Sequence, residues 1–246
     1  MNSATKQIRY IIYGTERIEF MRVPRKSNSH RVLIKVHPDC SVVVHAPLEA
    51  PDDDVCDAVR KRASWVYLQL KQFKVQLEHV SPRRFRSGES HCYLGKQYIL
   101  KVVEAPKENQ KVKLLRGHIE VHVRAKSEAR IRTLLFEWYK ARAREVFKRR
   151  LDAMLEQTLW VGSRPHLRLL SMKTQWGSCS PNGILTLNPH LVKAPRECID
   201  YVLLHELCHI AEHNHSDKFY RLMKQVMPKW QQTKEKLDSM ASKLLT

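Results

Sequence analysis

The histidines near the C-terminal end of the chain have a spacing that suits a metal ion. His205 and His209 are four residues apart, and Glu206 directly follows the first of them. On a helix, residues four apart lie on one face, so both imidazoles can reach a single ion. Zinc accepts neutral imidazole nitrogens and, with three protein ligands, keeps a fourth position open for water. The segment therefore predicts a catalytic zinc site in which Glu206 acts as general base toward that water without binding the metal.

A third histidine completes this predicted ligand set. His215 stands six residues after His209, beyond the end of the helix, so the chain must bend back toward the first two ligands. The pattern His-Glu-x-x-His-x5-His resembles that of the metzincin zinc peptidases, in which a glycine three residues after the second histidine makes the turn. This chain has Glu212 at that position. The turn is therefore predicted at His213 and Asn214, because asparagine tolerates left-handed backbone geometry.

Several nearby side chains are alternatives or additions to this set. His213 is an alternative third ligand and Cys179 an alternative thiolate ligand, with a turn position and a buried loop position as the simpler interpretations. Asp200 and Asp217 are candidates for orienting a ligand imidazole, with surface or capping roles as the alternative. Candidate donors to the oxyanion of a tetrahedral intermediate are Tyr201 and Tyr220.

These residues need a helix and a turn to position them. Pro195 precedes a helix predicted over residues 196–212, and another helix follows the turn near 216–226. Two strands near 167–173 and 184–187, joined by a loop over 175–183, come before the helix.

A long helix predicted over residues 127–159 has a basic second half. Lys140, Arg144 and Lys148 share one face of it at i, i+4 spacing. This face has two interpretations, the solvated side of an amphipathic helix or a phosphate-binding face.

The first half of the chain alternates apolar and polar residues in the manner of strands, with one helix near residues 52–77 that begins in an acidic turn. Strands followed by helices predict the α+β class. We expect a β-rich N-terminal domain over 1–125 and a more helical domain over 126–246. The predicted strands cover residues 31–37, 41–46, 97–103, 112–115 and 118–124.

The charge of the chain is unusual, with 44 basic and 25 acidic residues and a formal net charge of +19. This balance favours polyanionic partners, nucleic acid first and an anionic membrane surface second. A solubilising shell is the alternative, because net charge by itself reads no nucleic-acid sequence.

The sequence contains no apolar run long enough to span a membrane, and residues 1–10 lack the apolar stretch of a secretory signal. Its six cysteines form no Cys-x-x-Cys pair, which argues against a disulfide framework or a cysteine-rich zinc ribbon. A cytoplasmic protein is therefore expected.

Sequence blocks on both sides of the histidines resemble a known family. In this order they are similar to the YgjP-like metallopeptidases, which belong among the zincins related to the SprT-like proteins. Members often have arginine before the Trp-Gly-Ser motif, where this chain has Gln175. The blocks are Gln-Trp-Gly-Ser-Cys-Ser at 175–180, Gly-Ile-Leu-Thr-Leu-Asn at 183–188, Tyr-Val-Leu-Leu-His-Glu-Leu-Cys-His at 201–209, Asn-His-Ser at 214–216, Phe219, and Met-Pro at 227–228.

This resemblance implies a zinc peptidase with His205, His209 and His215 as ligands and Glu206 as the catalytic residue. It also implies a zincin-like domain over 126–246, built from a long helix, a small sheet and an active-site helix. By analogy with zincins, the strand over 184–188 is expected to pair with an extended substrate backbone.

The sequence thus predicts a zinc-dependent hydrolase, most simply a metallopeptidase that cleaves a peptide or protein substrate. One alternative is a zinc hydrolase of a non-peptide amide or ester, which ligand spacing does not distinguish. Another is a nucleic-acid-binding protein with a structural or vestigial zinc site, which the net charge favours and Glu206 disfavours. The sequence makes no prediction of the oligomeric state.

Overall fold

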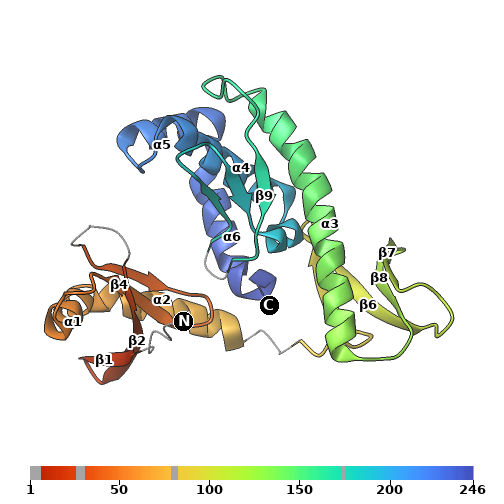
Figure 1. Cartoon of the computed structure of the whole chain (residues 1–246), viewed down its shortest axis with the longest axis horizontal. Coiled ribbons are helices and arrows are strands. Elements are labelled where there is room, and N and C mark those ends of the chain that lie inside the picture. The colour runs from red at the N-terminus through yellow and green to blue at the C-terminus, as the bar shows by residue number, and fades with distance from the viewer. Residues whose placement is uncertain (1–6, 26–30, 79–82, 173–174, 246) are drawn as a thin grey trace. The chain divides into compact units, whose positions relative to one another are not determined.

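The computed structural model describes residues 7–25, 31–78, 83–172 and 175–245. The chain divides into two compact units, Met1–Ser81 and Pro82–Thr246 (Figure 1). Helices and small sheets occur in both, which confirms the predicted α+β class. The division lies between residues 81 and 82, so the boundary predicted between 125 and 126 falls inside the second unit.

The first unit is a four-stranded sheet with helices on one face. Its strand order is β1-β2-β4-β3, with β2 and β4 parallel and the other neighbours antiparallel. Alternate residues of these strands, such as Ile11, Phe20 and Val44, form a core with Val55 and Val66 of the helices. The elements are β1 (Gln7–Tyr13), β2 (Glu16–Pro24), β3 (Leu33–Val36), β4 (Val42–Ala46), α1 (Asp52–Arg60) and α2 (Ala63–Glu78).

The segment predicted as one helix near residues 52–77 contains two. Between α1 and α2 the N–H of Arg62 donates to the carbonyl of Val59, a bond that spans three residues and tightens the chain into a turn. The turn redirects the helix axis while Val55, Val59 and Val66 all stay buried against the sheet. The apolar spacing alone does not reveal such a change of direction.

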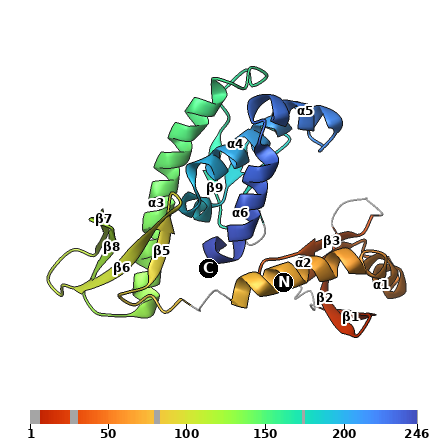
Figure 2. The ribbon, with the colours of Figure 1, turned by 180° about the vertical axis from the view of Figure 1, so that it is seen from behind.

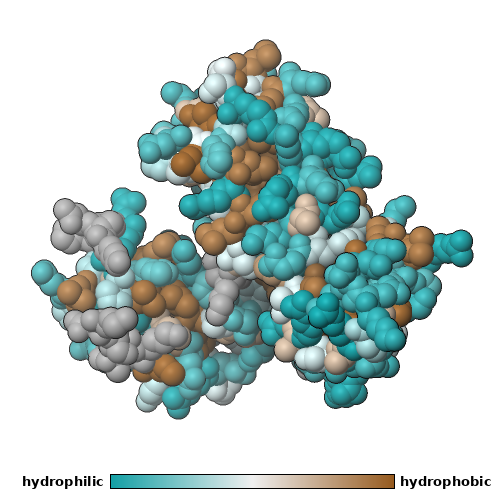
Figure 3. Space-filling model, turned by 45° about the vertical axis from the view of Figure 1, so that its right-hand side comes forward, coloured by the Kyte–Doolittle hydropathy of each residue, from teal (hydrophilic) through white to brown (hydrophobic). Residues whose placement is uncertain are grey.

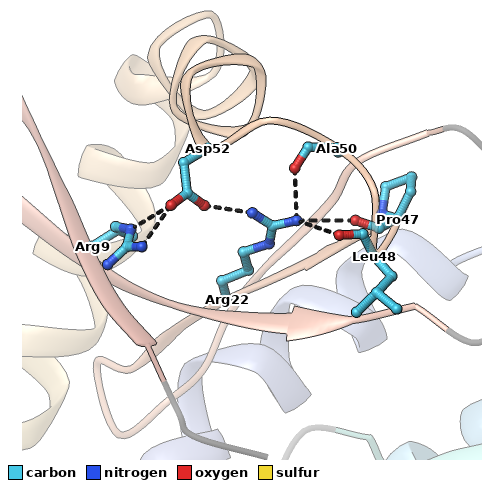
Figure 4. Close-up of polar contacts among 6 residues, drawn as sticks. All are labelled: Arg9, Arg22, Pro47, Leu48, Ala50 and Asp52. Atoms are coloured by element: carbon cyan, nitrogen blue, oxygen red, sulfur yellow. Dashed lines mark hydrogen bonds and ion pairs between the residues drawn. The ribbon is translucent and has the colours of Figure 1, made fainter.

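An ion-pair network joins the first two strands to the start of α1 (Figure 4). Asp52, the first residue of α1, accepts hydrogen bonds from Arg9 of β1 and Arg22 of β2. Arg22 also donates to the backbone carbonyls of three residues in the preceding loop, Pro47, Leu48 and Ala50, at 2.8–3.2 Å. Hydrogen bonds from Arg9 and then Arg22 lower the pKa of Asp52. The network thus anchors the loop that leads into the helix.

The second unit combines two sheets with a long central helix. One sheet has the order β5-β6-β8-β7, and the smaller one the order β10-β11-β9. Its strands are β5 (Ser90–Tyr93), β6 (Lys96–Glu104), β7 (Lys111–Leu115), β8 (His118–Val123), β9 (Leu167–Leu169), β10 (Gly177–Cys179) and β11 (Leu185–Leu187). Its helices are α3 (Glu128–Leu155), the 3₁₀ helix η1 (Pro189–Lys193), α4 (Arg196–Ala211), α5 (Asp217–Val226) and α6 (Trp230–Leu245).

Helix α3 runs between the β5–β8 sheet and the helices α4 and α6 (Figures 1 and 2). Its buried residues, among them Leu135 and Phe147, belong to one continuous core that extends from Cys92 of β5 to Leu244 of α6. The strands β5–β8 therefore pack with the helical part of the second unit. The predicted strand near 167–173 is shorter, ending at Leu169, and Lys173 lies outside the described residues.

Hydrophobic residues on the face seen in Figure 3 are interrupted by hydrophilic ones on both units. Within the described residues, no helix combines the length and apolarity that a membrane span requires.

Candidate metal centre

Three histidines meet at the end of α4. His205 and His209 lie one turn apart on α4, and His215 comes from the connection between α4 and α5. One ring nitrogen from each lies within 4.8 Å of the others. His205 Nε2 and His215 Nε2 lie 3.2 Å apart. The spacing on the helix and the return of the chain after it thus bring together the three side chains that the sequence singled out.

The return of the chain uses no left-handed residue. The C-cap residue Glu212 is extended, with φ −134°, and its N–H donates to the carbonyl of Cys208. The chain bends at His213 and Asn214, as predicted, but no residue between Glu212 and Ser216 has a positive φ, so the expected left-handed geometry is wrong. The extended Glu212 precedes this bend, and Ser216 follows it and caps α5 by accepting from the Phe219 N–H at 3.4 Å.

The aromatic ring of Phe219 packs against the rings of all three histidines. Its ring is fully buried, and its centroid lies 5.0, 4.6 and 4.7 Å from those of His205, His209 and His215. Phe219 lies in the first turn of α5, which Ser216 caps. This position, four residues after His215, brings its ring back to the histidines. The sequence blocks that resemble the family include Phe219 but do not indicate that it packs against the histidines.

The donor set fits zinc. A tetrahedral ion with Zn–N bonds of about 2.0–2.1 Å separates its ligand nitrogens by about 3.3 Å, close to the 3.2 Å between His205 and His215. The Nδ1 of His209 lies 3.0 Å from the carbonyl oxygen of Glu212. Donation to that carbonyl leaves its Nε2 with a lone pair for a metal.

Burial favours, in His205 and His215, the neutral form that a metal requires. It lowers the pKa of His205 to about 3, with further contributions from His209 and His215. Burial also lowers the pKa of His215.

Glu206 is buried beside the histidines, with 5% of its surface exposed. Its carboxylate accepts a hydrogen bond from the backbone N–H of Cys179 in β10, and burial raises its pKa to about 8. A Cβ placed on Gly177 would lie 2.7 Å from Glu206 Oε1 and 2.9 Å from its Cγ. The glycine of the Trp-Gly-Ser motif therefore makes room for this side chain, a function that the sequence around Gly177 does not reveal.

The small sheet corrects one expectation about the substrate. The strand over 184–188 was expected to pair with an extended backbone, but β11 is the central strand, antiparallel to β10 and parallel to β9. Both of its edges are therefore occupied by neighbours within this chain. Among the described strands of this sheet, β10 and β9 lie at the edges, and β10 is the one that contacts Glu206.

Three other residues that the sequence offered as metal ligands or as partners of a ligand have different contacts or positions. Asp200 accepts two hydrogen bonds from Arg150 at 2.7 and 2.8 Å, so it holds α4 to α3 instead of orienting an imidazole. Among the described residues the cluster of possible metal ligands includes neither Cys179 nor the exposed His213. The thiol of Cys179 lies 3.5 Å from the Ser180 carbonyl.

The two tyrosines lie close to the histidine cluster. Tyr201 lies one helical turn before His205, at 5.9 Å between ring centroids, and burial raises its pKa. Tyr220 lies 6.2 Å from His215 and stacks on Trp230 at 5.5 Å. Asp217 begins α5.

A model of the family described as "YgjP-like, metallopeptidase domain" matches residues 30–240. Among solved structures, the chain is similar to the metallopeptidase zymogens abylysin of Pyrococcus abyssi and jannalysin of Methanocaldococcus jannaschii, each 22% identical. The abylysin match covers 39% of this chain and 90% of abylysin, with a TM-score of 0.33. The jannalysin match covers 39% and 92%, with a TM-score of 0.32. No curated protein matches the chain.

Proposed function

The chain belongs to the YgjP-like metallopeptidase family, and on this premise we propose that it is a zinc peptidase whose metal is held by His205, His209 and His215. The observation that carries the proposal is the convergence of three ring nitrogens within 4.8 Å beside a buried carboxylate, that of Glu206. Family membership implies a divalent metal, and three imidazoles make zinc the best fit.

Glu206 is proposed as the general base. Zinc, when bound, lowers the pKa of a coordinated water to about 7 and polarises a peptide carbonyl. A carboxylate oxygen of Glu206 takes a proton from the attacking water and delivers it to the leaving amine nitrogen. The N–H of Cys179 and the close contact with Gly177 restrict the orientations open to this side chain. Such restriction supports proton transfer because misplaced groups transfer protons slowly.

We propose that an extended substrate backbone pairs with the outer edge of β10. Hydrogen bonds join Asn188 N to Trp176 O and Ser180 N to Ile184 O, so alternate residues of this strand face β11. By the alternation of an antiparallel ladder, the backbone groups of Gly177 point to the other side. A substrate backbone that pairs there would run beside Glu206, whose carboxylate already accepts from Cys179 on that side.

We also propose that this arrangement is zincin-like. Helix α4 carries the first two histidines and contacts both β10 and α3. The prediction of a β-rich N-terminal domain over 1–125 and a metallopeptidase domain over 126–246 stays a proposal. Truncation at either boundary, 81/82 or 125/126, would test which fragment folds alone. The shared core favours the first.

Zinc content and peptidase activity test the proposed function together. Purified full-length protein should hold about one zinc per chain after dialysis, and the His215→Ala variant much less. The Glu206→Gln variant should keep zinc and lose turnover of a quenched-fluorescence peptide library. Retained turnover in Glu206→Gln would exclude its role as base. Hydrolysis of ester substrates with no peptide cleaved would favour the non-peptide hydrolase.

Nucleic-acid contact is a second proposal, supported by the surface of α3. Arg144 and Lys148 are exposed and Lys140 is half-buried on one face of this helix. In the described part of the chain no ion pair with a carboxylate involves these three. Such a face suits a phosphate backbone, which is bound by charge without base readout.

A further inference from the structure

Strand β1 of the first unit exposes an apolar face at the edge of its sheet. It stands at one end of the order β1-β2-β4-β3, so within the described sheet it pairs only with β2. Ile8, Tyr10 and Ile12 are 64%, 53% and 59% exposed, and alternate residues of a strand point to one face. Ile11, on the other face, is buried in the core formed with the helices. These three exposed residues form the apolar face of β1.

The charged side chain of β1 lies on the opposite face of the strand. Arg9 donates to Asp52 at the start of α1 (Figure 4). Charged side chains, above all lysine, commonly protect edge strands against pairing with another chain. The edge strands β3 and β7 carry such residues, Lys35 in the first and Lys111 and Lys113 in the second. The apolar face of β1 contains no charged residue.

The turn after β1 determines which of its backbone groups point to the outer edge. Tyr13 pairs with Glu16 across the two-residue turn of Gly14 and Thr15, and Gly14 has a φ of +61°. A glycine with positive φ at the first central position is typical of a type II′ turn, whose flanking residues form a hydrogen-bonded pair. Such pairs alternate along an antiparallel ladder, so the odd-numbered residues of β1 bond to β2. The N–H and C=O groups of the three apolar residues therefore point to the outer edge.

We propose that this outer edge pairs with β1 of a second copy of the chain, in an antiparallel dimer with twofold symmetry. Ile8 and Ile12 lie two residues on either side of Tyr10, so the apolar face is symmetric about Tyr10. A register centred on Tyr10 places Ile8 opposite Ile12 of the second copy and Tyr10 opposite its own copy. Every outward N–H and C=O group of the three residues then has a partner, and the strands overlap over the whole of Gln7–Tyr13.

The side chains of β1 are compatible with this register. Arg9 lies opposite Ile11 of the second copy, so like charges do not face each other across the new ladder. The Tyr10 ring is held in place by Arg17, whose guanidinium carbon lies 4.1 Å from the ring centroid and which pairs with Glu19 at 3.0 Å. An unrelated extended polypeptide needs no symmetry about Tyr10. The sequence of β1 therefore favours a second copy as the occupant of this edge.

The dimer should be reversible. One strand of seven residues is a small contact beside the about 20–30 residues that each partner contributes to a stable interface. The dimer is also independent of the peptidase function, because β1 lies in the first unit and the three histidines lie in the second.

Sedimentation velocity of the full-length protein tests the proposal, at about 0.15 M salt to screen repulsion between the basic chains. Between about 1 and 300 µM the wild type should shift from monomer to dimer. Ile12→Lys should raise the dissociation constant of the dimer at least about tenfold, because it places a charge on the pairing edge. Leu68→Lys, a matched change at an exposed leucine of α2, should not. A wild type that stays monomeric throughout would overturn the proposal, even if β1 then bound an extended peptide.

A compensating pair of substitutions tests the register. Ile8→Glu alone should weaken the dimer, whereas Ile8→Glu combined with Ile12→Lys should restore it, because opposite charges then face each other between the copies. Within one chain the two positions are about 13 Å apart along the strand, too far to pair. Both side chains are exposed, and circular dichroism of each variant checks that the fold is kept. A folded double variant that dimerises no better than Ile12→Lys alone would overturn this pairing of β1.

Discussion

Gly177 and Glu206 are in contact, and the contact leaves no room for a side chain at position 177. A Cβ there would lie 2.7 Å from Oε1 of Glu206 and 3.0 Å from Leu187 Cδ2. The strand that borders the histidine cluster therefore determines where the proposed general base can lie. This relation joins two sequence blocks that are separated by the whole of β11, η1 and half of α4.

Gly177→Ala is expected to displace the Glu206 carboxylate. We predict a loss of about 10–100-fold in kcat/KM with unchanged zinc content, because small misplacements of a catalytic group have effects of this size. Peptide turnover and elemental analysis measure the two quantities. Gly162→Ala is the control, since a Cβ there meets nothing within 4 Å. Full activity in Gly177→Ala would show that the carboxylate tolerates the shift.

Phe219→Leu is expected to weaken metal binding. The ring packs on all three imidazoles, so its loss should raise the zinc dissociation constant about tenfold, as is typical of groups that orient metal ligands. Phe147→Leu in α3 is the matched control, because Phe147 is equally buried and lies outside the cluster.

Both phenylalanine variants should lose about 1–2 kcal/mol of unfolding free energy. Competition with a zinc chelator and urea unfolding separate the two effects. An equal change in zinc affinity in both variants would refute a specific role for Phe219.

Acid should destabilise the second unit through His190. Its pKa, lowered by burial and then by Lys193, is about 3 in the folded chain, below the usual 6.5. The folded state therefore binds fewer protons on this ring than the unfolded state does. The resulting stability is complete above pH 6.5 and is lost as the pH falls toward 3.

Urea unfolding at pH 7.5, 5.5 and 4 measures this dependence. Between pH 7.5 and 4 the wild type should lose about 1–3 kcal/mol more than His190→Leu, which has no ring to protonate. His91, with a pKa lowered by burial to about 4, acts in the same direction in both proteins and cancels in the comparison. Parallel curves for the two proteins would contradict the prediction.

If the basic face of α3 binds nucleic acid, the affinity of the protein for DNA should depend on salt concentration through this face. Replacing Lys140, Arg144 and Lys148 by glutamine should reduce the slope of log affinity against log salt for duplex DNA by up to about 3, since each phosphate contact contributes about 0.9. The control replaces cations that already pair with carboxylates: Arg164, Lys234 and Lys236. Equal slopes in both triple variants would attribute binding to net charge alone.

The sequence by itself determined the features that depend on short spacing. His205 and His209 share a face because a helix repeats every 3.6 residues, and the chain after α4 is short enough to return His215 to them. The strands β4, β6, β7 and β8 and the helices α3 and α4 lie close to their predicted ranges for the same reason, since their hydrophobic periods are local.

Only the tertiary structure decided which strand lies at an edge and what supports the site. Whether β11 is central depends on β9 and β10, whose pairing no local pattern of β11 reveals. No local pattern reveals the contact of Gly177 with Glu206 or the hydrogen bonds from Arg150 to Asp200. Nor does one reveal that the β5–β8 sheet shares a core with α3. Each of these depends on contacts between distant segments, and burial against a partner is a property of the folded chain.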